Sequence, residues 1–254
     1  MMKKYAVYII IVLFFCECGR KVKTESNELL VFSAASLTNV ISELTDQYER
    51  ENNIGFQLNY ASSGTLARQI EYGAEPSVYI SANEKWVDYL IQLGILISES
   101  KRKVAGNSLV IVVPVNSLID SISFRDDFTR MFKGRLAMGD PKHVPAGDYA
   151  QQAINNAGYA DELKDRILPA QDVRSALMVV ELGEVEMGIV YKTDALKSEK
   201  VKIVSNVPAE LHSPIAFYAA IVKNKNDDQA IHFYEYLSSP EAKTIWLKHG
   251  FNIE

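Results

Sequence analysis

The chain has 254 residues, of which 48% are hydrophobic and 10% aromatic, so it can bury one large core or two ordinary ones. Its 32 acidic and 27 basic residues give a net charge of -5, and they are mixed along the sequence without a basic stripe that could follow a phosphate backbone. The composition therefore predicts a globular protein and argues against nucleic acid as a partner.

The N-terminus has the layout of a secretory signal, in which a basic start precedes an apolar segment. Lys3 and Lys4 come before the apolar run YAVYIIIVLFF, residues 5–15, and polar and charged residues begin at Glu17. The run is shorter than the roughly 20 residues that span a bilayer. We therefore assign residues 1–28 to a signal segment and expect export, with a retained membrane anchor as the alternative.

Both cysteines of the chain, Cys16 and Cys18, fall directly after this run, so no disulfide framework supports the globular part. A cysteine in this position resembles a bacterial lipoprotein signal, in which the new N-terminal cysteine carries a lipid. Leu13 fits that pattern, whereas Phe14 and Phe15 replace the small residues that such signals prefer. Cys16 is the candidate lipidation site and Cys18 its alternative. The expected location is the periplasm or, with a lipid anchor, the outer face of the cell envelope.

From residue 29 onward, short apolar runs alternate with helical patterns of apolar residues. The runs are rich in β-branched and aromatic residues and are bounded by turn formers, which is typical of strands. We expect strands at residues 29–32, 55–60, 77–81, 109–113, 135–138, 188–191 and 201–204. Between them, helical stripes are predicted to be buried at Leu37, Val40, Ile41, Leu44 and Tyr48, at Leu66, Ile70 and Ala74, and at Val173, Ala176, Leu177 and Val180. This alternation predicts an α/β fold with mainly parallel sheets flanked by helices.

No long linker, internal repeat or low-complexity segment divides the chain. A chain of this length without a linker favours two lobes whose boundary is crossed more than once, and we place the crossings near Asn107 and Pro214. Lobe 1 then comprises residues 29–107 and 214–254, and lobe 2 comprises residues 108–213.

Small or hydroxylated residues mark four helix starts. Ser36 follows the first strand at an N-cap position, and a cap alone would be the ordinary explanation for one serine. The arrangement recurs in YASSGTLARQI (60–70), HVPAGDYAQQAI (143–154) and PAQDVRSAL (169–177). In an α/β sheet such turns gather at the carboxyl edge, where ligands bind. Because helix N-termini offer unpaired N–H donors and a partial positive charge, the sequence predicts an anion site made from neutral donors.

A wider set of motifs carries a family resemblance. The chain contains, in order, AASLTNV, YASSGTLARQIEYGAEPSVYISANEKWVDYL, GNSLVIVVP, GRLAMGDPKHVPAGDYA, AQDVRSAL, GIVYKTDA and FYEYLSSPEAKTIWLKHGFNI. From Leu29 nearly to its end it therefore resembles the ModA family, the periplasmic molybdate-binding proteins of bacterial ABC importers. The resemblance implies a two-lobed periplasmic binding protein fold of type II. It also implies a monomer without a cofactor, which closes around molybdate or tungstate in the interlobe cleft and delivers the anion to an importer permease with its ATPase.

The resemblance implies five ligand contacts in this sequence: Ser36, Ser63, Ala146, Val173 and Tyr191. The serines would donate through hydroxyl and backbone N–H, the alanine and valine through N–H alone, and the tyrosine through its phenol hydroxyl. All five would contact the oxygens of the anion, and none would ligate the metal directly. Four of them coincide with the helix starts, whereas the tyrosine rests on the resemblance alone.

Three further residues bear on this site. Gly64 stands where the family often has serine, which either loosens the loop beside Ser63 or eases a close approach of the backbone. Asp148 and Asp172 would repel a dianion unless their carboxylates turn away toward the helix dipole. Molybdate and sulfate only accept hydrogen bonds at neutral pH, whereas hydrogen phosphate needs an acceptor. Phosphate is therefore disfavoured if neither aspartate faces the cavity, and sulfate differs from molybdate only in size.

Two other classes of function fit the sequence less well. A serine hydrolase would need a base near its nucleophile, but no histidine lies in a G-x-S-x-G elbow, and His143 fits a loop-stabilising role better. No H-E-x-x-H, paired C-x-x-C or G-x-x-x-x-G-K-[ST] motif supports zinc binding or nucleotide hydrolysis. A scaffold of the cell envelope is the other class, but the aromatic stretches EKWVDYL and HFYEYLSS keep the helical spacing of core residues. We expect a binding protein and not an enzyme, with sulfate or phosphate as the alternative ligand.

Overall fold

The computed structural model describes residues 28–126 and 128–253, where ten strands form two five-stranded sheets. The first sheet has the order β2-β1-β3-β10-β4, with β1 at Glu28–Ala34, β2 at Gly55–Ala61, β3 at Val78–Ser81, β4 at Arg102–Gly106 and β10 at Ala216–Ile221. The second has the order β7-β6-β8-β5-β9, with β5 at Leu109–Pro114, β6 at Leu136–Gly139, β7 at Ile167–Ala170, β8 at Met187–Tyr191 and β9 at Val201–Asn206. The proposed signal segment up to residue 27, with Cys16, lies outside the described residues.

Both sheets are mixed, whereas the sequence had indicated mainly parallel sheets. Strand β1 pairs in parallel with β2 and β3, and β6 pairs in parallel with β7 and β8. Strands β10 and β5 pair antiparallel with both of their neighbours. Each of these two strands enters its sheet directly from the other sheet, at the carboxyl edge of the parallel strands, and therefore runs in the opposite direction.

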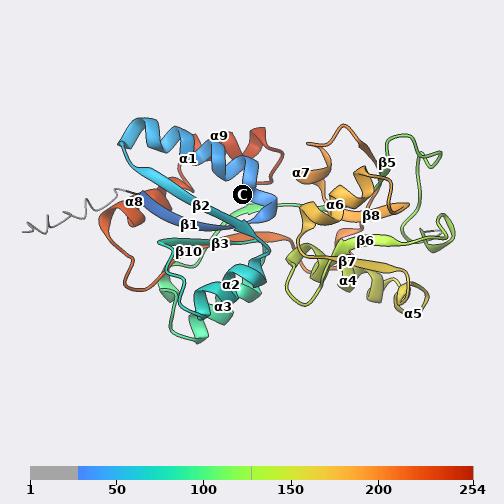
Figure 1. Cartoon of the computed structure of the whole chain (residues 1–254), viewed down its shortest axis with the longest axis horizontal. Helices are drawn as coiled ribbons and strands as arrows, with labels where there is room; N and C mark the ends of the chain where they lie inside the picture. The colour runs from blue at the N-terminus through green and yellow to red at the C-terminus, as the bar shows by residue number, and fades with distance from the viewer. Residues whose placement is uncertain (1–27, 127, 254) are drawn as a thin grey trace, which may run out of the picture.

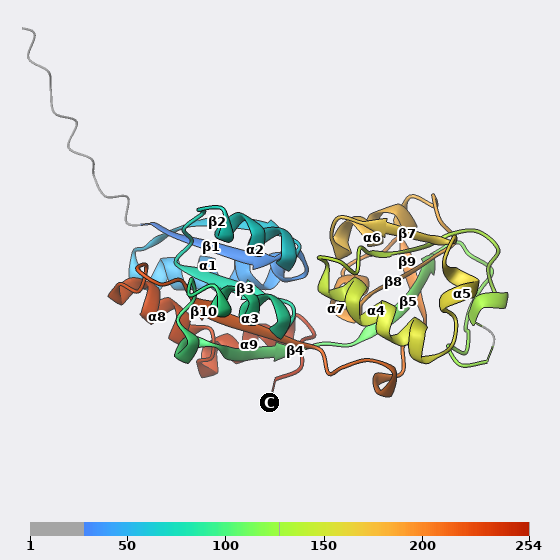
Figure 2. The same cartoon turned by 90° about the horizontal axis from the view of Figure 1, so that it is seen from below.

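Figures 1 and 2 show the two sheets in two lobes that lie side by side. The chain passes from the first sheet to the second between Gly106 and Leu109 and returns between Asn206 and Ala216. We keep the division at residues 107 and 214 as a prediction, and we use lobe 1 and lobe 2 for the parts that carry the first and second sheets.

Helices cover both faces of each sheet (Figure 1). In lobe 1, α1 (Thr38–Asn52), α8 (Asp228–Tyr236) and α9 (Pro240–Lys248) lie on one face, and α2 (Ser63–Glu71) and α3 (Glu84–Gln92) on the other. In lobe 2, α4 (Pro145–Asn156) and α5 (Ala160–Leu163) lie on one face, and α6 (Val173–Glu181) and α7 (Lys192–Ala195) on the other. Short 3-10 helices are η1 (Ala35–Leu37), η2 (Ser98–Ser100), η3 (Phe128–Arg130) and η4 (Ala209–Leu211). No helix within the described ranges is long and apolar enough to cross a membrane.

The apolar stripes that predicted the helices are buried, except for Ala74, which lies beyond the end of α2 and is half-buried. Helix α1 buries Val40, Ile41, Leu44 and Tyr48, and α6 buries Val173, Ala176, Leu177 and Val180. Along β1, Val31 packs into the core on the α1 face, whereas Phe32 packs into the cluster below α2 and α3. Neighbouring strand residues thus enter opposite layers, as the two-residue period of a strand requires. The buried Trp86 and Leu90 of α3 and Phe233 of α8 confirm core packing for the two aromatic stretches.

Three strands were not among those predicted, β4, β7 and β10, and two of them, β4 and β7, are edge strands of their sheets. Strand β4 begins with Arg102 and Lys103, and β7 contains Pro169. An edge strand has one side free of ladder hydrogen bonds, so it tolerates proline and charged residues that would disrupt a central strand. These residues removed the apolar pattern by which the other strands were recognised.

Candidate functional site

Six turns meet between the lobes and line a small cavity. Three of them follow β1, β2 and β3 in lobe 1, and three follow β6, β7 and β8 in lobe 2. The carboxyl edges of both sets of parallel strands therefore face one cavity, which is where α/β sheets bind ligands. All five predicted contact residues line it: Ser36, Ser63, Ala146, Val173 and Tyr191.

Ser36 lies in the 3-10 turn η1 between β1 and α1. It is not an N-cap, as its sequence position had indicated, because Ala34 caps the turn and Leu37 precedes α1, and neither makes a side-chain capping bond. The inserted turn starts the helix one residue later than expected, at Thr38 with Leu37 as its N-cap. Neither the hydroxyl nor the N–H of Ser36 has a hydrogen-bond partner among the described residues, so both are available to a ligand.

Two serines have separate tasks at the start of α2. The Ser62 hydroxyl caps the helix by accepting a hydrogen bond from Thr65 N–H at 3.3 Å. The buried Ser63 hydroxyl accepts one from Ala82 N–H at 2.9 Å, which leaves its own proton to be donated. Ser63 N–H has no partner in the described chain, so this residue offers two donors. Sequence reasoning missed Ala82, because only the packing of β3 against β1 brings it to Ser63.

Two helix starts of lobe 2 supply backbone donors. Pro145 is the first residue of α4, and the next residue, Ala146, has an N–H that no described residue accepts. At α6, the carboxylate of the N-cap Asp172 accepts from Ser175 N–H at 2.8 Å and from the Ser175 hydroxyl at 3.1 Å. The first residue of that helix, Val173, also keeps an N–H without a partner in residues 28–126 and 128–253.

Tyr191 ends β8 and is 1% exposed. Its hydroxyl is buried and makes no hydrogen bond to any described residue. Burial raises the pKa of the Tyr191 hydroxyl well above its ordinary value, so the group is a protonated donor at neutral pH. Its position is set by the pairing of β8 with β5, in which it lies opposite Leu109. The helix after it, α7, spans only Lys192–Ala195, which explains why no helical pattern marked this start in the sequence.

The described residues that line the cavity include no lysine, arginine or histidine. Asp172 is the one charged residue of the lining, and both of its oxygens serve the α6 cap. Asp148 lies outside the lining, 4.0 Å from Lys85 Nζ, and accepts a hydrogen bond from Gln152. The lining thus presents hydrogen-bond donors and helix N-termini without a free carboxylate, an arrangement that binds an anion which only accepts hydrogen bonds.

The same lining offers no general base. With no histidine or lysine there, neither Ser36 nor Ser63 has a group that could accept its proton during nucleophilic attack. Among residues 28–126 and 128–253, no three His, Cys, Asp or Glu side chains gather in a way that could hold a metal ion.

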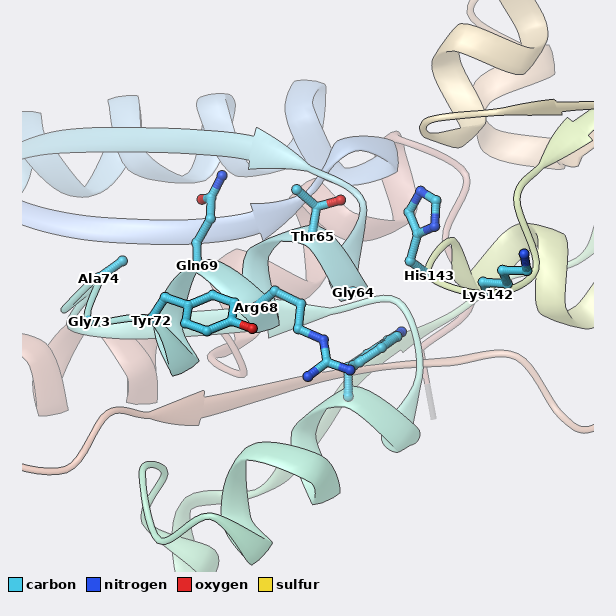
Figure 3. Close-up of a pocket in the computed structure, with 10 residues that line it drawn as sticks. Gly64, Thr65, Arg68, Gln69, Tyr72, Gly73, Ala74, Lys142 and His143 are labelled. Carbon is cyan, nitrogen blue, oxygen red and sulfur yellow. The ribbon is translucent and has the colours of Figure 1, made fainter.

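A larger and more open groove adjoins the cavity. Figure 3 shows Arg68 and Tyr72 on its α2 side and Lys142 and His143 of lobe 2 at its end. Arg68 Nη1 lies 2.7 Å from a carboxylate oxygen of Glu71, so its charge already has a counter-ion. Most of the residues that line this groove belong to α2 and the turn after it, whereas several helix N-termini converge on the smaller cavity. We therefore assign the anion site to the smaller cavity.

Comparisons with known proteins agree with this arrangement. The family described as bacterial extracellular solute-binding protein matches residues 29–252. The molybdate-binding protein ModA of Escherichia coli K12 is 39% identical over 245 residues, which cover 95% of each chain. YvgL of Bacillus subtilis, named as an ABC transporter substrate-binding lipoprotein, is 36% identical over 263 residues and 100% of both chains. The solved periplasmic molybdate-binding protein of Azotobacter vinelandii has a TM-score of 0.79 at 24% identity, over 89% of this chain and 99% of that one, which confirms the two-lobed α/β fold.

Proposed function

The chain belongs to the family of bacterial extracellular solute-binding proteins that includes the ModA molybdate-binding proteins, and we propose that it captures molybdate or tungstate and delivers the anion to an ABC importer. The energy for transport would come from the ATPase of that importer, because this sequence has no nucleotide-binding G-x-x-x-x-G-K-[ST] motif. The protein itself would act as a receptor, without a cofactor.

One observation carries this proposal: among the described residues, the cavity lining offers hydrogen-bond donors to an anion but no cation and no unpaired carboxylate. Ser36 and Ser63 each present a hydroxyl and an N–H, and one donor each comes from Ala146, Val173 and Tyr191. A hydrogen bond to a charged group contributes roughly 1.5–3 kcal/mol, so several together bind a dianion tightly even after its desolvation. The dipoles of α2, α4 and α6 add positive potential at the same place.

The donor set also discriminates between oxyanions. Hydrogen phosphate carries a proton that needs an acceptor, and the lining's carboxylate, Asp172, is occupied by Ser175 on both oxygens. Sulfate makes the same hydrogen bonds as molybdate and differs in size, so it is the stronger competitor. We therefore rank molybdate and tungstate first, sulfate second and phosphate last.

Binding would favour closure of the lobes, because the anion contacts both. Ser36 and Ser63 lie in lobe 1, whereas Ala146, Val173 and Tyr191 lie in lobe 2. An anion held from one side alone would lose about half of its donors, so its affinity for the closed arrangement exceeds that for any open one. This difference in affinity is what shifts the population toward the closed state.

We place the protein outside the cytoplasm, in the periplasm or on the outer face of the cell envelope, held there by a lipid where Cys16 is modified. The family's extracellular role and the name of the Bacillus subtilis relative support this placement. The basic start and apolar run of residues 1–15 supply the export signal. Labelling cells with a radioactive fatty acid would test the anchor, since Cys16→Ser should abolish incorporation into the protein.

Isothermal titration calorimetry with molybdate, tungstate, sulfate and phosphate tests the function directly. We expect tight binding of molybdate and tungstate, with sulfate weaker and phosphate weakest. Thermal unfolding provides a second measurement, because a bound ligand stabilises the folded state by RT ln(1 + [L]/Kd). An absence of heat and of thermal stabilisation with molybdate and tungstate would refute the proposal, and a preference for sulfate would select the alternative ligand.

A further inference from the structure

A backbone hydrogen bond joins the two lobes beside the anion site. Gly64 N–H, at the second residue of α2 in lobe 1, donates to the carbonyl of His143 in lobe 2 at 3.0 Å. Figure 3 shows these two residues facing each other where α2 meets the loop that leads into α4. Gly64 directly follows the donor Ser63, and His143 comes shortly before the donor Ala146, so the bond lies between two walls of the site.

No side chain fits at position 64 in this arrangement. A Cβ atom there would lie 2.6 Å from the His143 carbonyl oxygen, 2.7 Å from His143 Cβ and 2.6 Å from Cζ2 of Trp86. Packed interiors do not absorb contacts this short without a shift of the backbone. Gly64 lies within a helix and has an ordinary helical conformation, so this close approach, rather than an unusual φ angle, is what requires glycine.

The acceptor side of the bond is held firmly. The Asp140 carbonyl accepts hydrogen bonds from His143 N–H at 3.2 Å and from Val144 N–H at 2.8 Å, and an Asp140 carboxylate oxygen accepts from Lys142 N–H at 3.0 Å. This tight turn fixes the direction of the His143 carbonyl relative to the start of α4. A contact made to that carbonyl therefore also positions the α4 donors.

The three backbone N–H groups of Ser63, Gly64 and Thr65 in the first turn of α2 have different partners. Thr65 N–H bonds to the Ser62 hydroxyl and Gly64 N–H to His143, whereas Ser63 N–H has no partner in the described chain. One donor thus caps the helix, one reaches the other lobe, and one remains for the ligand.

We propose that Gly64 is a positioning residue, which latches the closed lobes through His143 and sets the spacing between the Ser63 and Ala146 donors. The inference rests on the proposed function, and it adds that affinity depends on a lobe-to-lobe contact which does not touch the anion. A side chain at position 64 would hold the lobes apart while every donor of the site is retained.

The test compares Gly64→Ala with the wild type by calorimetry and by small-angle X-ray scattering at saturating molybdate. We expect binding that is weaker by roughly 5- to 150-fold, the range to which the overpacking of one contact corresponds. The scattering should give a larger radius of gyration than that of the molybdate-saturated wild type. Gln69→Ala is the matched control, since it also places alanine in α2 but on the exposed side, and it should bind and close like the wild type.

A second pair of variants separates the latch from packing inside lobe 1, because Trp86 also crowds position 64. Trp86→Leu removes that neighbour, so of these close contacts Gly64→Ala in the Trp86→Leu background keeps only those with the carbonyl oxygen and Cβ of His143. The latch predicts that alanine still weakens binding in this background. Full recovery of the affinity would overturn the proposal, and so would wild-type affinity and compactness of the single variant Gly64→Ala.

If the proposed function is wrong, the outcome differs from the one expected if only the Gly64 proposal is wrong. The wild type would then bind none of the four oxyanions, and the ligand-free scattering profiles would decide on the latch. Gly64→Ala should still have a more extended average shape than the wild type, and identical ligand-free profiles would contradict the latch.

Discussion

Arg174 connects the buried carboxylate of Asp194 to the opposite lobe. Its Nε lies 3.3 Å from Oδ1 of Asp194, and its guanidinium also donates to the Asn39 side chain on α1. Oδ2 of Asp194 is buried without a hydrogen-bond partner among the described residues. Burial raises the pKa of Asp194 from 3.8 to about 7, against the opposing effect of the Arg174 charge. One side chain next to the anion site thus serves both an ion pair and a lobe contact.

The raised pKa of Asp194 predicts a stability that falls as pH increases. Between about pH 4 and pH 7 the folded state keeps a proton that the unfolded chain has released, so the free energy of unfolding decreases across this window. This difference between the pKa of Asp194 in the unfolded and folded states corresponds to a change of roughly 4 kcal/mol at most in the free energy of unfolding. Asp194→Asn removes the titration. Urea unfolding at a series of pH values should therefore show the stability of the variant gaining on that of the wild type between about pH 4 and pH 7.

The comparison with Asp194→Asn also removes the contribution of other groups. Hydrogen bonds from Lys248 and His249 lower the pKa of Glu43, which destabilises the protein at low pH in both chains and cancels in the difference. If the free energies of unfolding of the wild type and of Asp194→Asn changed in parallel between about pH 4 and pH 7, Asp194 would not titrate in this range.

Replacing Ser63 by alanine should weaken molybdate binding by roughly 1–3 kcal/mol, because the variant loses a hydroxyl donor to the anion. It also leaves the buried Ala82 N–H without its acceptor, which weakens the wall of the cavity. Calorimetry measures the affinity. Ser62→Ala is the control, since it removes the α2 cap and lowers thermal stability while all five proposed contacts remain. Equal affinity of Ser63→Ala and the wild type would remove Ser63 from the site.

Sequence patterns predicted features that depend on neighbouring residues, such as helix starts. They missed features that depend on the pairing of strands or on contacts between the lobes. The starts of α4 at Pro145 and of α6 at Val173 fall within the two predicted segments, HVPAGDYAQQAI and PAQDVRSAL, because proline and cap residues act within one turn. The cap assigned to Ser36 was wrong, since an inserted 3-10 turn leaves no trace in the apolar spacing. Tyr191 was found by resemblance alone, because strand pairing, which brings it to the cavity, has no local signature. The bond between Gly64 and the other lobe was outside the reach of any pattern for the same reason.

Tyr191→Phe should have opposite effects on the free and the ligand-bound protein. The Tyr191 hydroxyl is buried without a partner in the described residues, so its removal should leave the ligand-free protein equally or more stable. The same change removes a donor from the anion, so affinity should fall by roughly 1–3 kcal/mol. Differential scanning calorimetry with and without molybdate reads both effects. A loss of stability without ligand, together with unchanged affinity, would assign the hydroxyl to the fold instead of the site.

A backbone donor can be tested at Val173 because of where it lies in its helix. It is the first residue of α6, a position that proline favours, and the preceding Asp172 is extended at φ -156 and ψ 175, as a residue before proline should be. Val173→Pro should therefore keep the helix and delete one N–H. We expect binding to weaken by roughly 1.5–3 kcal/mol with little change in the helix content seen by circular dichroism. Val173→Ala shortens the side chain but keeps the N–H, so it should bind nearly as the wild type does. If the two variants lost affinity equally, the side chain of Val173 and not its N–H would be what the anion site requires.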